Sequence, residues 1–160
     1  MDISGERGYT LVEIIIAMAL TAVVATAMAF AFLNFRNNVL YDILLNRIGE
    51  SVNYAKLKGI TSKLDSQDLR SSYSVKFFAD RIVEFEGDTY VEGDDANIEY
   101  EVPVGLRITS TCSPVDNSVV TFFAITGENS NYCTISIYKF EQAYPTGSVY
   151  IGKYGVEQAS

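Results

Sequence analysis

The sequence contains no histidine and no tryptophan. Histidine is the commonest general base and a very common metal ligand, so its absence excludes Ser-His-Asp and Cys-His catalytic arrangements. Acid–base chemistry would have to come from scattered carboxylates, and the chain has no glycine-rich loop of the phosphate-binding kind. We therefore expect no enzymatic activity, no catalytic residue and no cofactor.

Positive charge is also scarce. The chain has 12 lysines and arginines against 20 acidic residues, for a net charge of −8, and the basic residues never form a run. Proteins that bind nucleic acid neutralise its phosphates with a basic patch or stripe. The composition therefore argues against direct contact with nucleic acid.

Only two cysteines occur, Cys112 and Cys133, and both lie in the C-terminal half. An even number of cysteines in a small exported domain favours a disulfide, whereas in the cytosol two buried free thiols would be the simpler interpretation. A bridge would close a loop of roughly 20 residues and stabilise the domain by about 3 kcal/mol.

Charged residues are absent from one long stretch near the N-terminus. Residues 14–35 form an uncharged, mostly apolar run of 22 residues, preceded by a short polar segment. As a helix this run would rise about 33 Å, which is enough to cross a membrane. A secretory signal peptide cleaved near Ala25-Thr26-Ala27 is one alternative, but its apolar region would be too long and its start lacks net positive charge. A plain membrane anchor is another, but it gives no reason for a carboxylate at Glu13.

The segment Gly8-Tyr9-Thr10-Leu11-Val12-Glu13, followed by the apolar run, resembles the prepilin peptidase signature of type IV pilins and type II secretion pseudopilins. The resemblance implies a leader over residues 1–8, cleavage between Gly8 and Tyr9, and N-methylation of Tyr9. It also implies that residues 9–35 form a transmembrane and polymerisation helix. Glu13 would become the fifth residue of the mature chain and pair with the terminal amine of a neighbouring subunit, because two charges that are each costly in lipid are tolerated together.

The helix is expected to continue beyond the membrane as an amphipathic segment over residues 36–64. No proline interrupts the first 63 residues, and apolar residues recur near helical spacing. The alternative is two helices with a break near Asn37-Asn38, and Gly59 is a possible end. The apolar positions expected to be buried are Phe35, Val39, Ile43, Leu44, Ile48, Val52, Ala55 and Leu57.

Residues 65–160 are expected to form a β-rich globular domain. Period-two alternation and turn residues predict antiparallel strands over residues 72–79, 81–86, 97–102, 105–109, 118–125, 133–140 and 148–154. A long helix packed on such a sheet or small sandwich gives an α+β fold. The aromatic side chains at strand spacing are expected to pack in the core or on a sheet face: Tyr73, Phe77, Phe78, Phe85, Phe122, Phe123 and Tyr138.

This order of elements resembles the pilin layout, and the soluble half is most similar to the H-type (GspH/FimT-like) minor pseudopilins. The similarity rests on the segments 75–86, 101–108, 122–127 and 134–137, together with the region of Ile151 and Gly155. It implies a minor subunit of a type II secretion or type IV pilus-like filament. The expected partners are prepilin peptidase, other pilin or pseudopilin subunits, and the cytoplasmic membrane, crossed once with the C-terminal domain outside the cytoplasm. The alternatives are a membrane-anchored binding domain that does not polymerise and a minor pilin of a DNA-uptake system.

The densest acidic cluster contains Glu92, Asp94 and Asp95. Carboxylates are the ligands that calcium prefers, so Asp94 and Asp95 are a weak calcium candidate. The spacing matches no EF-hand loop, and a solvated turn accounts for the same residues. We therefore expect no metal site.

Overall fold

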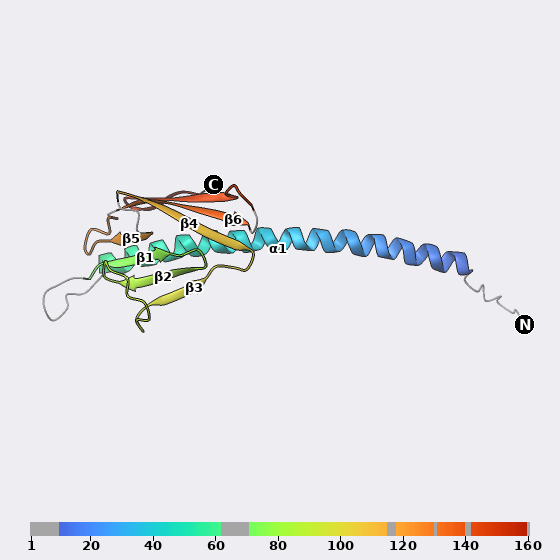
Figure 1. The fold of residues 1–160 in the computed structure, drawn as a ribbon, viewed down its shortest axis with the longest axis horizontal. Helices are drawn as coiled ribbons and strands as arrows, with labels where there is room; N and C mark the ends of the chain where they lie inside the picture. The colour runs from blue at the N-terminus through green and yellow to red at the C-terminus, as the bar shows by residue number, and fades with distance from the viewer. Residues whose placement is uncertain (1–9, 62–70, 115–117, 130, 140–141, 160) are drawn as a thin grey trace, which may run out of the picture. The chain divides into compact units, whose positions relative to one another are not determined.

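The computed structural model describes residues 10–61, 71–114, 118–129, 131–139 and 142–159. These residues form one helix followed only by strands (Figure 1). The chain divides into two compact units, residues 1–40 and 41–160. The helix α1 (Leu11–Thr61) contributes to both units.

Helix α1 is continuous over its 51 residues. The two-helix alternative with a break near Asn37-Asn38 is wrong, since both residues are helical. Gly59 does not end the helix either, which continues to Thr61. The absence of proline allows this length, because no backbone N–H is missing from the hydrogen-bond ladder.

In the second unit, α1 buries one narrow stripe of side chains. Leu44, Ile48, Val52 and Ala55 are each at most 2% exposed, and Ser51 and Gly59 lie on the same face. The spacing of three or four residues follows the helical period. Four of the positions predicted to be buried are instead exposed, because they lie outside this stripe or before the second unit: Phe35, Val39, Ile43 and Leu57.

Two four-stranded antiparallel sheets form the rest of the second unit. The first has the order β3-β2-β1-β5 and the second has the order β4-β6-β7-β8. The first sheet consists of β1 (Tyr73–Phe77), β2 (Arg81–Glu86), β3 (Ile98–Glu101) and β5 (Val119–Phe122). The second consists of β4 (Leu106–Ser113), β6 (Tyr132–Lys139), β7 (Gly147–Gly152) and β8 (Gly155–Ala159). The predicted α+β class, with a long helix packed on antiparallel sheet, is confirmed.

The C-terminal half of α1 contacts both sheets (Figure 1). Toward the first sheet, a Cβ atom added to Gly59 would lie 3.1 Å from the backbone oxygen of Phe122. Toward the second, the Lys56 Nζ donates a hydrogen bond to the backbone oxygen of Tyr154, at 2.7 Å. The apolar core therefore lies around the helix and between the two sheets. Packing against one sheet alone would leave part of the apolar stripe of α1 exposed to water.

The predicted strands differ from the observed ones where turns interrupt the alternation. The predicted strand 118–125 is shortened to β5, because Ser118 and Ile125 adopt positive φ angles of 58° and 74°. The strand predicted to end at Thr109 continues to Ser113. A separate strand β8 was not predicted: Gly155, with φ of 119°, turns the chain back along β7.

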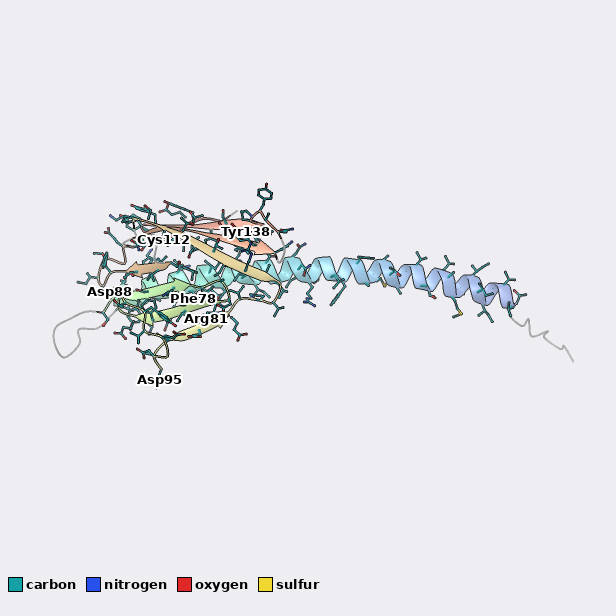
Figure 2. The ribbon with its side chains drawn as sticks, viewed as in Figure 1. Phe78, Arg81, Asp88, Asp95, Cys112 and Tyr138 are labelled. Carbon is teal, nitrogen blue, oxygen red and sulfur yellow. A yellow bond between two sulfur atoms is a disulfide. The ribbon has the colours of Figure 1, made fainter. Side chains whose placement is uncertain are left out.

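An aromatic and cationic cluster covers the outer face of the first sheet. The Tyr90 ring packs edge-on against Phe78 and Phe85, at centroid distances of 5.4 and 5.7 Å. The Arg81 guanidinium lies 4.6 Å from the Phe78 ring centroid (Figure 2), and the Lys76 Nζ lies 4.6 Å from that of Tyr90. These contacts hold the loop between β2 and β3 on the sheet.

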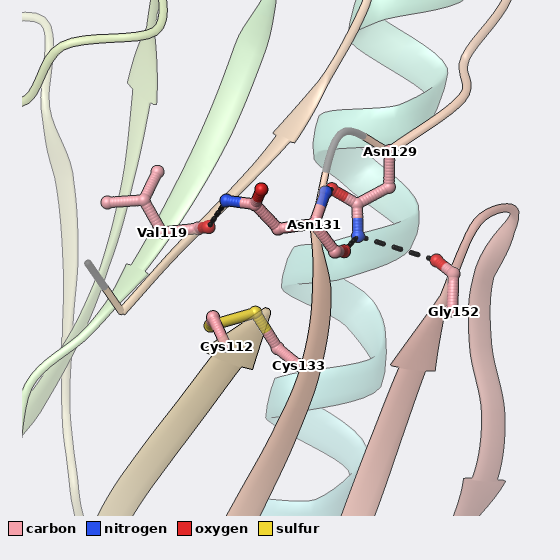
Figure 3. Close-up of a disulfide and its surroundings, with 6 residues drawn as sticks. All are labelled: Cys112, Val119, Asn129, Asn131, Cys133 and Gly152. Carbon is pink, nitrogen blue, oxygen red and sulfur yellow. Dashed lines mark hydrogen bonds between the residues drawn. A yellow bond between two sulfur atoms is a disulfide. The ribbon is translucent and has the colours of Figure 1, made fainter. Parts of the chain in front are cut away.

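The disulfide joins β4 to β6 in the second sheet (Figure 3). Cys112 and Cys133 face each other in the strand register, with their Cα atoms 4.1 Å apart. Nearby, the Asn131 Nδ2 donates to the backbone oxygen of Val119 at 3.2 Å, which links the residue before β6 to β5 in the other sheet. Buried Asn129 donates to the backbone oxygens of Asn131 and Gly152. The disulfide thus braces the second sheet, and the hydrogen bonds of the two asparagines tie the two sheets together at the same end.

Candidate functional site

The N-terminus of α1 is closed by a reciprocal pair of side chains. The Thr10 Oγ1 accepts a hydrogen bond from the Glu13 backbone N–H at 3.3 Å. The Glu13 Oε2 in turn accepts bonds from the Thr10 backbone N–H and hydroxyl, both at 3.1 Å. This is a capping box, in which the N-cap and the third helical residue satisfy each other's free N–H groups.

The capping box gives Glu13 a local partner within its own chain. A carboxylate near the end of an apolar helix costs up to a few kcal/mol in lipid unless it is hydrogen-bonded or paired. The two bonds that the carboxylate accepts from Thr10 reduce this cost, and the negative charge is favourable at the positive end of the helix dipole. Sequence reasoning missed the role of Thr10, although Thr-x-x-Glu before an apolar run is the known signature of this cap.

Beyond the cap, the first unit presents apolar side chains to its surroundings. Large side chains such as Leu20, Val23 and Phe30 are 62–68% exposed. The hydroxyls of Thr21 and Thr26 donate to backbone oxygens within the helix, at 2.9 and 2.7 Å, so they need no water. An 18-residue window of α1 has a mean hydropathy of 2.4, which makes the helix apolar and long enough to span a membrane. The exposed apolar surface fits anchoring in a membrane.

Gly8 and Tyr9, the predicted cleavage and methylation site, lie outside the described residues. Glu13 is described and exposed, and its contacts are those of the cap. Glu13 belongs to the first unit, and Cys112 and Cys133 belong to the second.

Asp94 and Asp95 lie in the exposed loop between β2 and β3. The Asp94 Oδ1 accepts a hydrogen bond from the Ala96 backbone N–H at 2.9 Å, and its backbone oxygen accepts one from Asn97. In the part of the chain that the structure describes, no group of three or more histidine, cysteine, aspartate or glutamate side chains could hold a metal ion. The Asp94 carboxylate therefore closes a turn.

One acidic side chain, Glu84, is buried although we did not predict it to be. The Glu84 residue in the middle of β2 is only 5% exposed, and its side chain lies on the sheet face that packs against α1. Burial raises the pKa of its carboxyl, and the nearby Ser51 hydroxyl and Arg47 guanidinium partly oppose this. The signal was present in β2, because the alternation of Ile82, Glu84 and Glu86 places all three on one face.

Residues 3–29 match the family model described as the prokaryotic N-terminal methylation motif. The chain carries this motif. The match includes Gly8, Tyr9 and Glu13 and ends within the apolar half of α1. It supports a type IV pilin-like protein that is processed as a prepilin, with the fold of one long helix on antiparallel sheets. No curated protein and no solved structure matches the chain significantly.

Proposed function

We propose that the chain is a structural subunit of a type II secretion or type IV pilus-like filament. It is a minor pilin or pseudopilin of the H-type, cut by prepilin peptidase between Gly8 and Tyr9 and methylated on Tyr9. The observation that carries this proposal is the methylation motif over residues 3–29, which runs directly into an exposed apolar helix. The subunit has no catalytic role.

The capping box supports a specific role for Glu13 in assembly. While the subunit is alone in the membrane, Thr10 satisfies the carboxylate. When subunits assemble, the same carboxylate can accept the terminal amine of a neighbour, because an ionised carboxylate has about four acceptor positions and the cap uses two. The cost of the Glu13 charge in lipid is thus reduced before assembly. After assembly, its pairing with the neighbour's amine sets the axial register between subunits.

The processing step is tested by mass spectrometry of the mature N-terminus after expression with a prepilin peptidase. We expect a chain that begins with N-methylated Tyr9, and Gly8→Leu should accumulate as the uncut precursor. A mature chain that begins at Met1 or after Ala27 would overturn the proposal, since it would indicate a plain anchor or an ordinary signal peptide.

The assembly step is tested by three substitutions at the cap. Glu13→Gln keeps a capping side chain but removes the charge, so it should be inserted and cut normally yet enter filaments at least tenfold less. Glu13→Ala should behave in the same way. Thr10→Val removes the cap hydroxyl but keeps the charge, and it should still assemble. Normal incorporation of Glu13→Gln, measured in sheared filament fractions, would show that the charge has no role in assembly.

A further inference from the structure

The formal charge of the chain is concentrated in one segment. Residues 80–101 hold nine carboxylates and a single arginine, for a net charge of −8, which equals the net charge of the whole chain. The segment contains β2, the following loop and β3. Figure 2 labels two of its carboxylates, Asp88 at the left end of the second unit and Asp95 at its lower edge. The rest of the chain is therefore neutral overall.

Arg81 compensates only part of this charge. It lies within 3.7 Å of the carboxylates of Asp80, Glu92 and Glu99. Among the described residues, no ion pair within 4.0 Å involves Glu84, Glu86 or Glu101. Glu84 lies near the Arg47 guanidinium without forming an ion pair with it, Glu86 lies next to the helix, and Glu101 lies on the edge strand β3.

Two cavities lie along the seam between α1 and β3, which we call the α1–β3 groove. One has a volume of about 300 Å³ and is lined by Ile43 and Arg47 of the helix and by residues 99–101. The other has a volume of about 190 Å³ and is lined by Tyr54, Lys58, Glu84, Glu86 and Ile98 among others. The groove therefore combines aliphatic and aromatic walls with four carboxylates and two cations, so that negative charge predominates in it.

The groove is bordered by an open strand edge. Strand β3 is the end of its sheet and, in the described part of the chain, pairs only with β2 (Figure 1). The Val102 N–H bonds to the Asp80 oxygen at 2.8 Å. Because successive residues of a strand alternate in direction, the N–H and C=O groups of Glu99 and Glu101 point away from β2. They are available to an added strand.

The two faces of β3 differ in chemistry. Ile98 and Tyr100 pair with Glu84 and Ile82 of β2, so all four side chains lie on the sheet face toward α1. On that face the Arg47 guanidinium lies 4.4 Å from the Tyr100 ring centroid. The opposite face carries the Glu99 and Glu101 carboxylates. A strand added at this edge would thus meet carboxylates on one face and the apolar walls of the groove on the other.

We propose that the α1–β3 groove binds an extended segment of a different protein, in which lysine or arginine alternates with apolar residues. Its main chain pairs with the outward groups of Glu99 and Glu101, and its cations pair with their carboxylates. The apolar side chains enter the two cavities, where Glu84 and Glu86 favour a further cation at one end. This site is formed by residues within 43–58 and 73–103 and does not depend on processing or filament assembly.

Charge argues against a second copy of this chain as the occupant. Two copies that meet through the same edge would bring two segments of net charge −8 together, and like charges directly opposite destabilise strand pairing. The remainder of the chain contains no basic run to supply a complementary strand. A partner with alternating basic and apolar residues satisfies both faces at once.

The test uses the full-length chain in a non-ionic detergent and the fluorescent peptide acetyl-(Lys-Val)₃-amide. Fluorescence anisotropy gives Kd for the wild type and for four variants. Glu99→Gln combined with Glu101→Gln removes charge from the edge, and Glu84→Gln removes it from the cavity. Glu99→Pro removes one outward N–H without breaking a bond to β2. Glu157→Gln removes an exposed carboxylate from β8 in the other sheet and is the matched control.

We expect the double substitution and Glu99→Pro each to weaken binding at least tenfold, and Glu84→Gln about threefold. Glu157→Gln should change Kd less than twofold, and the peptide acetyl-(Glu-Val)₃-amide should not bind. Circular dichroism of each variant must match the wild type. Equal weakening by Glu157→Gln, or unchanged binding to Glu99→Pro, would overturn the proposal in favour of non-specific charge attraction. Self-association of the chain that Glu99→Pro abolishes would overturn it in favour of a second copy.

Discussion

Two glycines ten residues apart in α1 provide a sharp test of how this helix packs. Gly49 is partly exposed, and a Cβ atom added there would meet nothing within 4 Å. Gly59 is buried, and its added Cβ would lie 3.1 and 3.3 Å from the backbone oxygens of Phe122 and Phe123. Substitution by alanine therefore makes the same chemical change in two different environments.

The expected magnitudes follow from these contacts. Alanine is about 1 kcal/mol more favourable than glycine inside a helix, so Gly49→Ala should raise the free energy of unfolding by that amount. Gly59→Ala gains the same helix preference but forces backbone oxygens of the β5 segment to move. Overpacking of this kind costs about 1–3 kcal/mol, and the Ile125 N–H bond to the Gly59 oxygen limits the adjustment. The two variants should differ by about 2 kcal/mol, with Gly59→Ala less stable than the wild type.

The assay is urea unfolding of the full-length chain in detergent micelles, followed by near-ultraviolet circular dichroism of the tyrosines, which lie almost entirely in the second unit. Equal m-values would show that the midpoints report stability. In thermal unfolding the same difference corresponds to a gap of roughly 8 °C for a unit of this size. If the unfolding midpoints of both variants shift in the same direction by similar amounts, α1 does not approach β5 as closely as the structure shows.

Three further predictions concern the disulfide, the buried carboxylate and the cap. Replacing both Cys112 and Cys133 by alanine should lower the free energy of unfolding by about 3 kcal/mol, because the bridge closes a loop with a sequence separation of 21; a wild-type urea midpoint for the double variant would contradict this. The folded-state pKa of Glu84 is raised by burial, so the stability that it contributes is complete below the unfolded-state pKa and is lost as pH rises through the folded-state pKa. Glu84→Gln should consequently be more stable than the wild type at pH 7, with the difference shrinking as pH falls toward about 4 in urea titrations; a constant difference would show that burial does not perturb this group. Thr10→Val should leave the second unit unchanged in stability, because the cap belongs to the first unit; a shifted midpoint would show that the two are coupled.

The membrane-spanning segment and the motif in the first 35 residues could be predicted from the sequence, because both depend only on residues that are contiguous in the chain. A run of 22 uncharged residues is long enough to span lipid, whatever the rest of the chain does. The motif around Gly8, Tyr9 and Glu13 is contiguous, so it can be recognised without a structure. The cap between Thr10 and Glu13 was equally local and could have been predicted from its spacing.

The strands were predicted better than their ends. Alternation located seven strands, since side chains on a sheet face alternate whether or not the sheet order is known. The ends depended on positive φ angles at Ser118, Ile125 and Gly155, which the alternation of side chains does not predict. For the same reason the alternation around Ile151 was predicted as one strand, although the chain reverses there to form β7 and β8.

The sequence by itself determined the long helix, the methylation motif, the antiparallel character of the second unit and its acidic charge. Each is set by composition or by a pattern along the chain, and the physics behind it acts between near neighbours. The tertiary structure alone decided which stripe of α1 is buried, why Gly59 must lack a side chain, and that Glu84 is enclosed beneath the helix. It also placed the open edge of β3 beside α1, where four carboxylates line the two cavities of the α1–β3 groove: Glu84, Glu86, Glu99 and Glu101. These features depend on the order of strands and on contacts between distant segments, which no local pattern specifies.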